Sequence, residues 1–345
     1  MQNDEPGTRS KPGRSKTIGE EKDMRIITAA LALAALMAGP ALAQDKYPSK
    51  QINLVVPYSP GGGNDITARA IAPALQRILG QPVLVTNKPG AAGAVATQSV
   101  AIAAPDGYNI LVSNTQVILL PAVDKLFDRK PAFAKEDFQY IARLTADPVL
   151  MFVAQDAPWK NLNELIADAK AKDGAIIYSS GGLYGGTHVP VEMFLKGAGI
   201  KMRHLPTGGG GPALTAVLGG NAGLVASFPA VAAAQAKANK IRPLASWGSK
   251  RHPDYPDTPT FKESGIDIEY EPWIAFLLPK ATPAAIVQTL REATRKAAAD
   301  KEYLDAMAKA GSGTAYLDQP EFEAFLKKDA ELQEAAIMGI GRVQQ

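Results

Sequence analysis

Cysteine is absent from this chain of 345 residues, and histidine occurs only three times, at His188, His204 and His252. Without thiols the chain has no disulfides, no thiol nucleophile and no cysteine that could carry a lipid. The histidines have neither the paired spacing of metal ligands nor a Ser/His/Asp order or Gly-x-Ser-x-Gly elbow around them. The sequence therefore predicts no metal, no cofactor and no enzyme, with a secreted hydrolase as a minor alternative.

A large excess of either charge is also missing. Lys and Arg together number 37, and Asp and Glu number 34. Nucleic-acid-binding proteins need surplus cationic groups to neutralise phosphates, so this balance argues against a nucleic-acid partner. With no disulfides and a hydrophobic fraction of 46%, stability has to come from apolar cores.

The longest apolar run is too short to cross a bilayer comfortably. It follows Arg25, continues to Met37 and precedes Gly39-Pro40 and the small-residue triplet Ala41-Leu42-Ala43. This order predicts a signal peptide that is cleaved after Ala43, with an uncleaved membrane anchor as the alternative. Residues 1–23 are polar and without periodicity, and we interpret them as an upstream extension, so 1–43 stay outside the fold.

What remains is about 300 residues, enough for two medium domains. Short β-rich runs alternate with helical stretches, which predicts an α/β fold with mostly parallel sheets flanked by helices. We expect strands at 52–56, 83–86, 110–113, 140–144, 149–153, 176–179, 202–205, 224–227, 242–247 and 274–278. We expect helices at 65–79, 93–104, 161–174, 187–196, 212–218 and 230–238, one after Thr282-Pro283 and one after Asp318-Gln319-Pro320-Glu321.

The chain is expected to pass between two lobes twice. Pro148 restricts the residue before it to extended geometry, between two predicted strands. The second crossing is expected near 270–273, because 274–278 is a fresh apolar strand after a Pro-rich surface loop. We therefore assign 44–146 and 272–345 to lobe 1 and 147–271 to lobe 2. Two hinge crossings predict a body that closes over a ligand.

Glycine-rich turns follow three predicted strands and precede three predicted helices, at 56–69, 179–188 and 206–212. Free N–H groups at a helix start attract anions, and glycine lets an anion approach closely. Ligands of parallel sheets bind at the carboxyl ends of strands, so the three turns predict a binding cleft between the lobes. A single turn of this kind is equally well explained by positive φ angles, with Asp65 capping a helix.

Several segments resemble one known family of receptors. The chain is similar to the substrate-binding receptors of tripartite tricarboxylate transporters, the Bug receptors. The segments that carry the likeness are Tyr47-Pro48-Ser49-Lys50, Leu54 to Gly62, Asp65-Ile66-Thr67-Ala68-Arg69, Asn87 to Gly93, Pro105-Asp106-Gly107-Tyr108, Gly211 to Thr215, Gly219-Gly220, Pro256 to Thr260 and Pro279 to Pro283. They span essentially the whole mature chain.

The resemblance implies a periplasmic binding protein fold and a periplasmic location. It also implies one small carboxylate ligand, a di- or tricarboxylate or an aromatic acid, held by loop amides, hydroxyls and bridging water. The implied partner is the set of membrane permease subunits of a tripartite transporter, to which a monomeric receptor delivers its solute. A receptor that senses a carboxylate for a signalling system is the alternative.

Ligand-binding residues can be carried over from the family by position. One side of the site would consist of Tyr58, Ser59, Gly62, Asn64 and Asp65. The other side would consist of Ser180, Gly185, Thr187 and His188, with Thr207 and Ser227 at the floor. A hydrogen bond from His188 to a loop carbonyl explains that residue as well as ligand contact does.

Two positions depart from the family pattern. Tyr184-Gly185 stand where many members have Gly-Ser, so we expect Thr187 to supply the hydroxyl. The strand before Phe228 ends in Ala226-Ser227 where many members have Phe-Asp, and that Asp would pair with a ligand ammonium. We therefore expect a ligand without an amine. Phe228 is either a core residue, which burial statistics favour, or a stacking partner of an aromatic acid.

Overall fold

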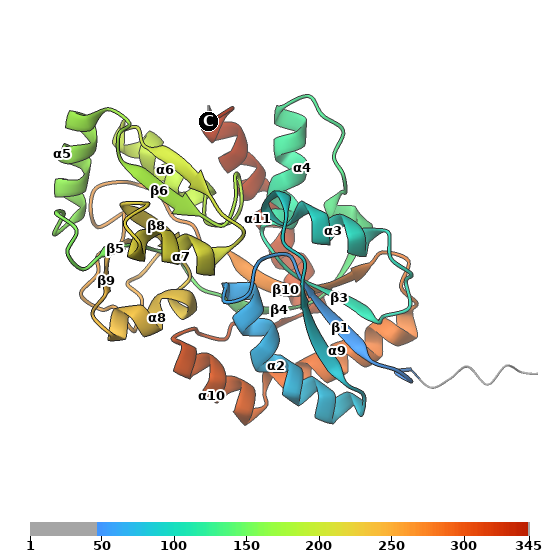
Figure 1. The fold of residues 1–345 in the computed structure, drawn as a ribbon. Helices are drawn as coiled ribbons and strands as arrows, with labels where there is room; N and C mark the ends of the chain where they lie inside the picture. The colour runs from blue at the N-terminus through green and yellow to red at the C-terminus, as the bar shows by residue number, and fades with distance from the viewer. Residues whose placement is uncertain (1–46, 344–345) are drawn as a thin grey trace, which may run out of the picture. The chain divides into compact units, whose positions relative to one another are not determined.

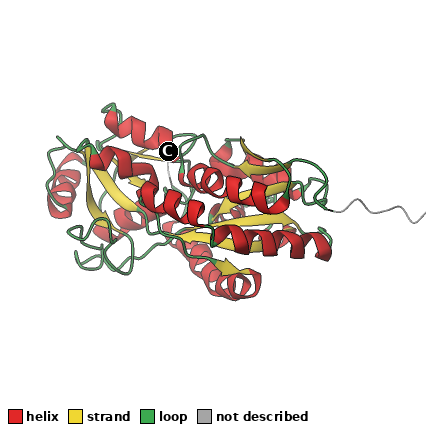
Figure 2. Cartoon of the chain, turned by 90° about the horizontal axis from the view of Figure 1, so that it is seen from below, coloured by secondary structure: helices red, strands yellow, loops and turns green. Residues whose placement is uncertain are grey.

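The computed structural model describes residues 47–343. Two mixed sheets, each flanked by helices, form two lobes (Figures 1 and 2). This arrangement confirms the predicted two-lobe α/β fold. The predicted signal peptide lies outside the described residues. Among those residues no helix is both long enough and apolar enough to span a bilayer.

The sheet of lobe 1 has six strands in the order β11-β4-β10-β3-β1-β2. Their bounds are β1 Ile52–Val56, β2 Val83–Asn87, β3 Asn109–Asn114, β4 Phe138–Ala146, β10 Trp273–Pro279 and β11 Leu317–Asp318. Strand β1 pairs in parallel with β2 and β3, whereas β10 runs antiparallel to β3 and β4. The sheet is therefore mixed, because β4 carries the chain out of the lobe and β10 brings it back in the opposite direction beside β4.

The sheet of lobe 2 has five strands in the order β7-β6-β8-β5-β9. Their bounds are β5 Leu150–Ala154, β6 Ile177–Ser180, β7 Arg203–Pro206, β8 Leu224–Ser227 and β9 Ile241–Ser246. It too is mixed, because β6 is parallel to β7 and β8 while β5 is antiparallel to β8 and β9. Strands β6, β7 and β8 are connected by helices and pair in parallel, whereas β5, the first strand after the chain enters lobe 2, runs antiparallel to β8.

Helices cover both sheets (Figure 2). In the part of the chain that builds the lobe 1 sheet they are α2 Gly63–Leu79, α3 Ala94–Ala101, α4 Gln116–Leu126, α9 Ala284–Ala298, α10 Lys301–Ala310 and α11 Gln319–Ile340, with short 3₁₀ turns η1 Ala91–Gly93 and η2 Lys135–Asp137. In lobe 2 they are α5 Leu162–Lys172, α6 Val189–Ala198, α7 Gly210–Leu218 and α8 Pro229–Lys237.

The predicted helix caps have mixed outcomes. Asn161 accepts a hydrogen bond from the amide of Glu164 at 3.0 Å, and Asp318 accepts one from Gln319 at 2.8 Å, which confirms both caps. Thr282 does not cap α9, because its hydroxyl donates to the carbonyl of Pro279. Helix α4 was not predicted. Its residues are buried from Gln116 to Leu119, so it lacks the polar face that periodicity detects.

The core of each lobe is built around a central buried strand. All of β10 is buried, and β5 is buried from Leu150 to Val153. Trp273, at the start of β10, is fully buried and its indole donates to the carboxylate of Asp329 at 2.7 Å. Burying a large apolar side chain stabilises the fold by roughly 1.5–3 kcal/mol. Burial of these strands therefore stabilises both lobes.

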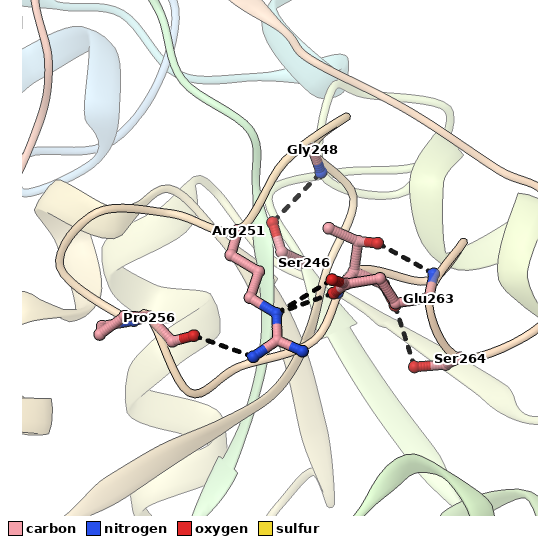
Figure 3. Close-up of polar contacts among 7 residues, drawn as sticks. Ser246, Gly248, Arg251, Pro256, Glu263 and Ser264 are labelled. Atoms are coloured by element: carbon pink, nitrogen blue, oxygen red, sulfur yellow. Dashed lines mark hydrogen bonds and ion pairs between the residues drawn. The ribbon is translucent and has the colours of Figure 1, made fainter.

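The chain returns from β9 to β10 through a segment without regular helix or strand, held by polar contacts (Figure 3). The Arg251 Nε atom lies 2.9 and 3.1 Å from the two carboxylate oxygens of Glu263, and Nη1 donates to the carbonyl of Pro256 at 3.1 Å. In the same segment Trp247 and Phe261 are buried, with ring centroids 4.3 Å apart. These contacts order the path back to lobe 1.

The C-terminal helix connects the two lobes. Helix α11 begins beside β4, and near its end Ile337 belongs to the apolar cluster of lobe 2. The hydroxyl of Tyr184 donates to the carbonyl of Gly341 at 2.9 Å and accepts from the amide of Val343 at 2.7 Å. The C-terminal end of the described chain thus packs on lobe 2, although its sequence range was assigned to lobe 1. The residue boundaries of the lobes stay a prediction.

Candidate functional site

The three glycine-rich turns lie at the carboxyl ends of β1, β6 and β7 and lead into α2, α6 and α7. The first turn belongs to lobe 1 and the other two belong to lobe 2 (Figure 1). They meet through their backbones, because the amide of Ser59 donates to the carbonyl of Gly208 at 2.9 Å. A Cβ atom on Gly62 would lie 3.5 Å from the nitrogen of Gly210, and one on Gly211 would lie 3.0 Å from the carbonyl oxygen of Pro60.

A cavity lies between these turns. Its lining residues are Tyr58, Gly62, Gly63, Asn64, Asn114, Gly181, Gly185, Gly186, Thr187, Gly210 and Phe228. Its volume is about 20 Å³, which accommodates roughly one water molecule. A dicarboxylate can enter this cavity only if the turns around it separate.

Larger hollows exist elsewhere on the described surface. One of them, of about 870 Å³, lies between β4 and α11 and is lined by both acidic and basic side chains such as Glu334 and Lys135. These two form an ion pair with each other. None of the three glycine-rich turns lines this hollow, so we place the candidate site in the small interlobe cavity.

The structure brings five of the predicted residues to the cavity wall. These are Tyr58, Gly62 and Asn64 from lobe 1, and Gly185 and Thr187 from lobe 2. The hydroxyl oxygen of Thr187 accepts a hydrogen bond from the amide of Gly181 at 3.0 Å. Its own proton can therefore be donated into the cavity.

Three further predicted residues support the turns. Ser59 joins the lobes through its amide. The carboxylate of Asp65 accepts from the amide of Gly61 at 2.9 Å, from Arg69 at 3.0 Å and from Asn87 at 2.9 Å. The hydroxyl of Thr207 donates to the carbonyls of Ser180 and Gly209, both at 2.9 Å. None of these side chains lines the cavity.

The last three predicted residues lie behind the wall. The hydroxyl of Ser180 lies 2.7 Å from the ring nitrogen Nε2 of His204, and the hydroxyl of Ser227 donates to the carbonyl of Phe228 at 3.2 Å. His188 is fully buried, and neither ring nitrogen has a hydrogen-bond partner among the described residues. The backbone amide of His188, not its ring, donates to the carbonyl of Gly185.

Sequence reasoning missed two side chains of the wall, Asn114 and Phe228. Asn114 ends β3, which pairs in parallel with β1. Ligands of parallel sheets bind at the carboxyl ends of strands, so this position could have been predicted. Phe228 was considered as a stacking partner, but burial statistics favoured a core residue. The glycines at positions 63, 181, 186 and 210 belong to the turns that were singled out.

The side-chain amides of the wall bind one another and the backbone. Asn64 donates to the carbonyl of Val112 at 2.7 Å, and Asn114 donates to the side-chain oxygen of Asn64 at 3.1 Å. The side-chain oxygen of Asn114 accepts from the amide of Gln116 at 2.9 Å. The hydroxyl of Tyr58 donates to the carbonyl of Ala92 at 3.1 Å. These groups shape the cavity but already have protein partners.

The family model described as the tripartite tricarboxylate transporter family receptor matches residues 67–341. The chain belongs to this family. Its members are periplasmic solute-binding receptors and not enzymes, and the match confirms the resemblance seen in the sequence.

Individual relatives agree with this assignment. A "UPF0065 protein in gbd 5'region" of Cupriavidus necator is 36% identical over 315 residues, which cover 91% of this chain and 94% of that protein. The solved structure of the periplasmic binding protein BugD superposes with a TM-score of 0.81 at 27% identity and covers 87% of this chain and all of that one. MatC of Rhodopseudomonas palustris, solved with bound malate, has a TM-score of 0.77 at 25% identity, covering 84% and 99% of the two chains.

In this tripartite-transporter receptor, three helix starts provide the positive potential of the cavity. The first helical hydrogen bond of α2 runs from Ile66 to Gly62, and that of α7 runs from Ala213 to Gly209. In α6 the amide of Val189 bonds to Gly185. Just before these donors, the amide of His188 bonds to Gly185 and Pro212 has no N–H. The other amides of the first turns have no helical partner and carry the positive ends of the helix dipoles. Such groups bind carboxylates without a cationic side chain.

The ionisable groups around the cavity add little net charge. Burial opposes ionisation of Asp65, but hydrogen bonds from Arg69, Gly61 and Asn87 outweigh it and lower the pKa of that carboxyl, so the charge stays paired. Burial lowers the pKa of His204 to about 4, and burial together with the neighbouring His204 lowers the pKa of His188 well below its usual value. Both rings are therefore neutral at neutral pH.

Metal binding has no geometric basis in the part of the chain that the structure describes. No three or more His, Asp or Glu side chains between residues 47 and 343 are grouped so that they would hold a metal ion.

Proposed function

We propose that this receptor binds one small di- or tricarboxylate, or an aromatic acid, between its lobes and delivers it to the permease subunits of a tripartite tricarboxylate transporter. One observation carries the proposal. Amides at the starts of three helices, from both lobes, converge on one cavity whose wall contains no ionised side chain. A carboxylate is the ligand group that such donors complement.

Ligand binding would be coupled to closure of the lobes. The cavity of about 20 Å³ is smaller than any dicarboxylate, so the ligand would enter a more open form. Closure would then present the amides of α2 from one side and those of α6 and α7 from the other. A ligand that contacts both lobes favours the closed form by its difference in affinity for the two forms.

The site residues divide into two proposed roles. Tyr58, Gly62, Asn64, Gly185 and Thr187 would contact the ligand, because they line the cavity. Asp65, Ser59, Ser180, Thr207, His188 and Ser227 would position the turns, because their polar groups or their bulk lie against the turns and not in the cavity.

The ligand would carry no amine. Ser227 ends β8 and its hydroxyl bonds to the neighbouring backbone, and the cavity wall holds no carboxylate to pair with an ammonium. An unpaired charge would lose its hydration on closure. Calorimetric binding of aspartate or glutamate that is tighter than binding of matched dicarboxylates would contradict this expectation. The malate bound to the family member MatC is a dicarboxylate without an amine.

A thermal-shift screen with a library of carboxylates tests the proposal, because a ligand of the folded state raises the melting temperature. We expect at least one carboxylate to raise it and amides of the same acids to have no effect. Thr187→Ala should weaken the response, since this hydroxyl faces the cavity. Thr289→Ala is the matched control, because Thr289 is a half-buried residue of α9, far from the cavity wall in the sequence, whose hydroxyl bonds within its own helix. A library without a single hit would contradict the proposal.

The proposed delivery of the solute to a permease requires that the receptor is exported to the periplasm. We propose that the chain is exported as a monomer after cleavage behind Ala43. Mass spectrometry of the periplasmic protein should find a chain that begins at Gln44, and gel filtration should give the size of a monomer. Loss of uptake on deletion of the receptor favours transport, whereas unchanged uptake with a lost transcriptional response favours the sensing alternative.

A further inference from the structure

Phe228 bridges the two lobes at the cavity. It follows β8, precedes the first residue of α8 and belongs to the apolar cluster of lobe 2. Its ring nevertheless reaches lobe 1, where the ring atoms Cδ2 and Cγ lie 3.0 and 3.2 Å from the position that a Cβ on Gly63 would occupy. Gly63 is the first residue of α2, so the ring covers one of the helix starts that line the cavity.

Lobe 2 holds the ring of Phe228 in place, whereas the contact of the ring with lobe 1 can separate. Pro229 follows it directly, the backbone of Phe228 is extended, and the side chain is buried to 7% exposure. Gly63 moves with lobe 1, and Phe228 moves with lobe 2. Any opening that admits a ligand therefore separates Phe228 from Gly63 and places the ligand between the ring and the amides of α2.

The remaining wall offers little to the middle of a ligand. The side-chain amides of Asn64 and Asn114 and the hydroxyl of Tyr58 already bind protein groups. The oxygen of Thr187 already accepts from Gly181, and the proton that this hydroxyl can donate would go to the carboxylate. The carboxylate of a ligand would accept hydrogen bonds from backbone amides. A hydroxyl or ammonium on the adjacent carbons would instead face the ring of Phe228, where it would lose its hydrogen bonds to water and gain none from the protein.

We infer that Phe228 determines ligand specificity by forming the apolar wall against which the carbon skeleton of the ligand packs. The ligand class is a carboxylate with an unsubstituted aliphatic or aromatic skeleton, preferred over hydroxylated acids of the same length. This inference rests on the proposed function and specifies its substrate class. It also unites the two interpretations of Phe228, because the ring is a core residue on one side and a ligand contact on the other.

Calorimetry with two matched pairs of acids tests the inference. Succinate is compared with tartrate, and adipate with galactarate, so that each pair differs only in hydroxyl groups. For whichever pair binds, we expect the unsubstituted acid to bind at least about tenfold tighter, the discrimination that an apolar pocket typically provides. Phe228→Leu should retain most of this ratio, whereas Phe228→Asn should reduce it severalfold.

The outcomes separate the inference from the proposed function. If neither these acids nor any other carboxylate binds, the proposed function fails. If carboxylates bind but the hydroxylated acid binds as tightly as its partner, the inference alone is overturned. The same holds if Phe228→Asn weakens both acids of a pair equally. Circular dichroism checks the fold of each variant, and should Phe228→Asn not fold, the wild-type ratio decides.

Discussion

Gly182 of lobe 2 and Ala92 of lobe 1 meet so closely that a Cβ atom on Gly182 would lie 2.9 Å from both the Cα and the Cβ of Ala92. Gly182 also has a φ of +141°, where residues other than glycine are strained. The contact lies beside the cavity, because the neighbouring Gly181 is part of its wall. The close contact of the two lobes thus requires a glycine at position 182.

Gly182→Ala should therefore weaken ligand binding. The clash and the strained backbone would disfavour the closed lobes by about 1–2 kcal/mol, which corresponds to roughly tenfold lower affinity. Gly199→Ala is the matched control, because Gly199 also has a positive φ of 61° but nothing within 4 Å of its would-be Cβ. We expect this control to lower the melting temperature without changing the dissociation constant. Equal affinities in both variants would refute the role of the contact.

Tyr184→Phe should destabilise the attachment of the C-terminal end. The hydroxyl bonds to Gly341 and Val343, and losing both bonds should cost about 1–3 kcal/mol in urea unfolding. Carboxypeptidase should then remove the end of the chain faster. Tyr303→Phe is the control, since the Tyr303 hydroxyl is buried without a partner in the described structure. Its removal should be neutral or stabilising, and a larger loss there than at Tyr184 would contradict this account.

Acidification should destabilise the protein below about pH 6.5. Burial lowers the pKa of His204 to about 4 in the folded chain, and it lowers the pKa of His188 well below the ordinary value of 6.5. Below pH 6.5 the histidines of the unfolded chain bind protons while those of the folded chain stay neutral. The stability present above pH 6.5 is therefore lost as the pH falls towards 4. The loss should be on the order of 1 kcal/mol per pH unit for each histidine. Glu192, whose pKa burial raises, offsets part of it.

The pH effect can be measured by thermal unfolding between neutral pH and mild acid. His204→Asn should reduce the slope, because it removes one of the two groups while its side chain can still bond to Ser180. A melting temperature that does not change with pH over this range would show that the two rings are not buried as neutral groups.

Asp65→Asn should loosen the first glycine turn. The carboxylate binds the amide of Gly61 as well as Arg69 and Asn87, and hydrogen bonds to a charged group contribute about 1.5–3 kcal/mol each. We expect unfolding at lower urea concentration together with weaker ligand binding. Asp305→Asn is the control, because Asp305 is exposed and pairs only with Lys301 one turn away on α10. This change should stay within about 0.5 kcal/mol.

Most of the fold could be predicted from the sequence, because strands such as Ile52–Val56 and caps such as Asn161 depend on neighbours in the chain. Helix α4 escaped prediction because tertiary contacts bury it, and the mixed sheets escaped because strand direction depends on where β10 returns. The candidate site was predictable to the level of its turns. Which side chains face the cavity was not, since Asp65 and His188 share those turns with Tyr58 and Thr187 yet point elsewhere.

The sequence by itself determined the two-lobe α/β fold and the glycine-rich turns, because hydrophobic periodicity, caps and turn residues act locally. The resemblance of its segments to known receptors indicated the family. The tertiary structure alone decided that the turns of both lobes meet at one small cavity. It also decided that His188 is withdrawn into lobe 2 and that the ring of Phe228 lies over the start of α2. These relationships join residues far apart in the chain, and they exist only once both lobes have packed and closed.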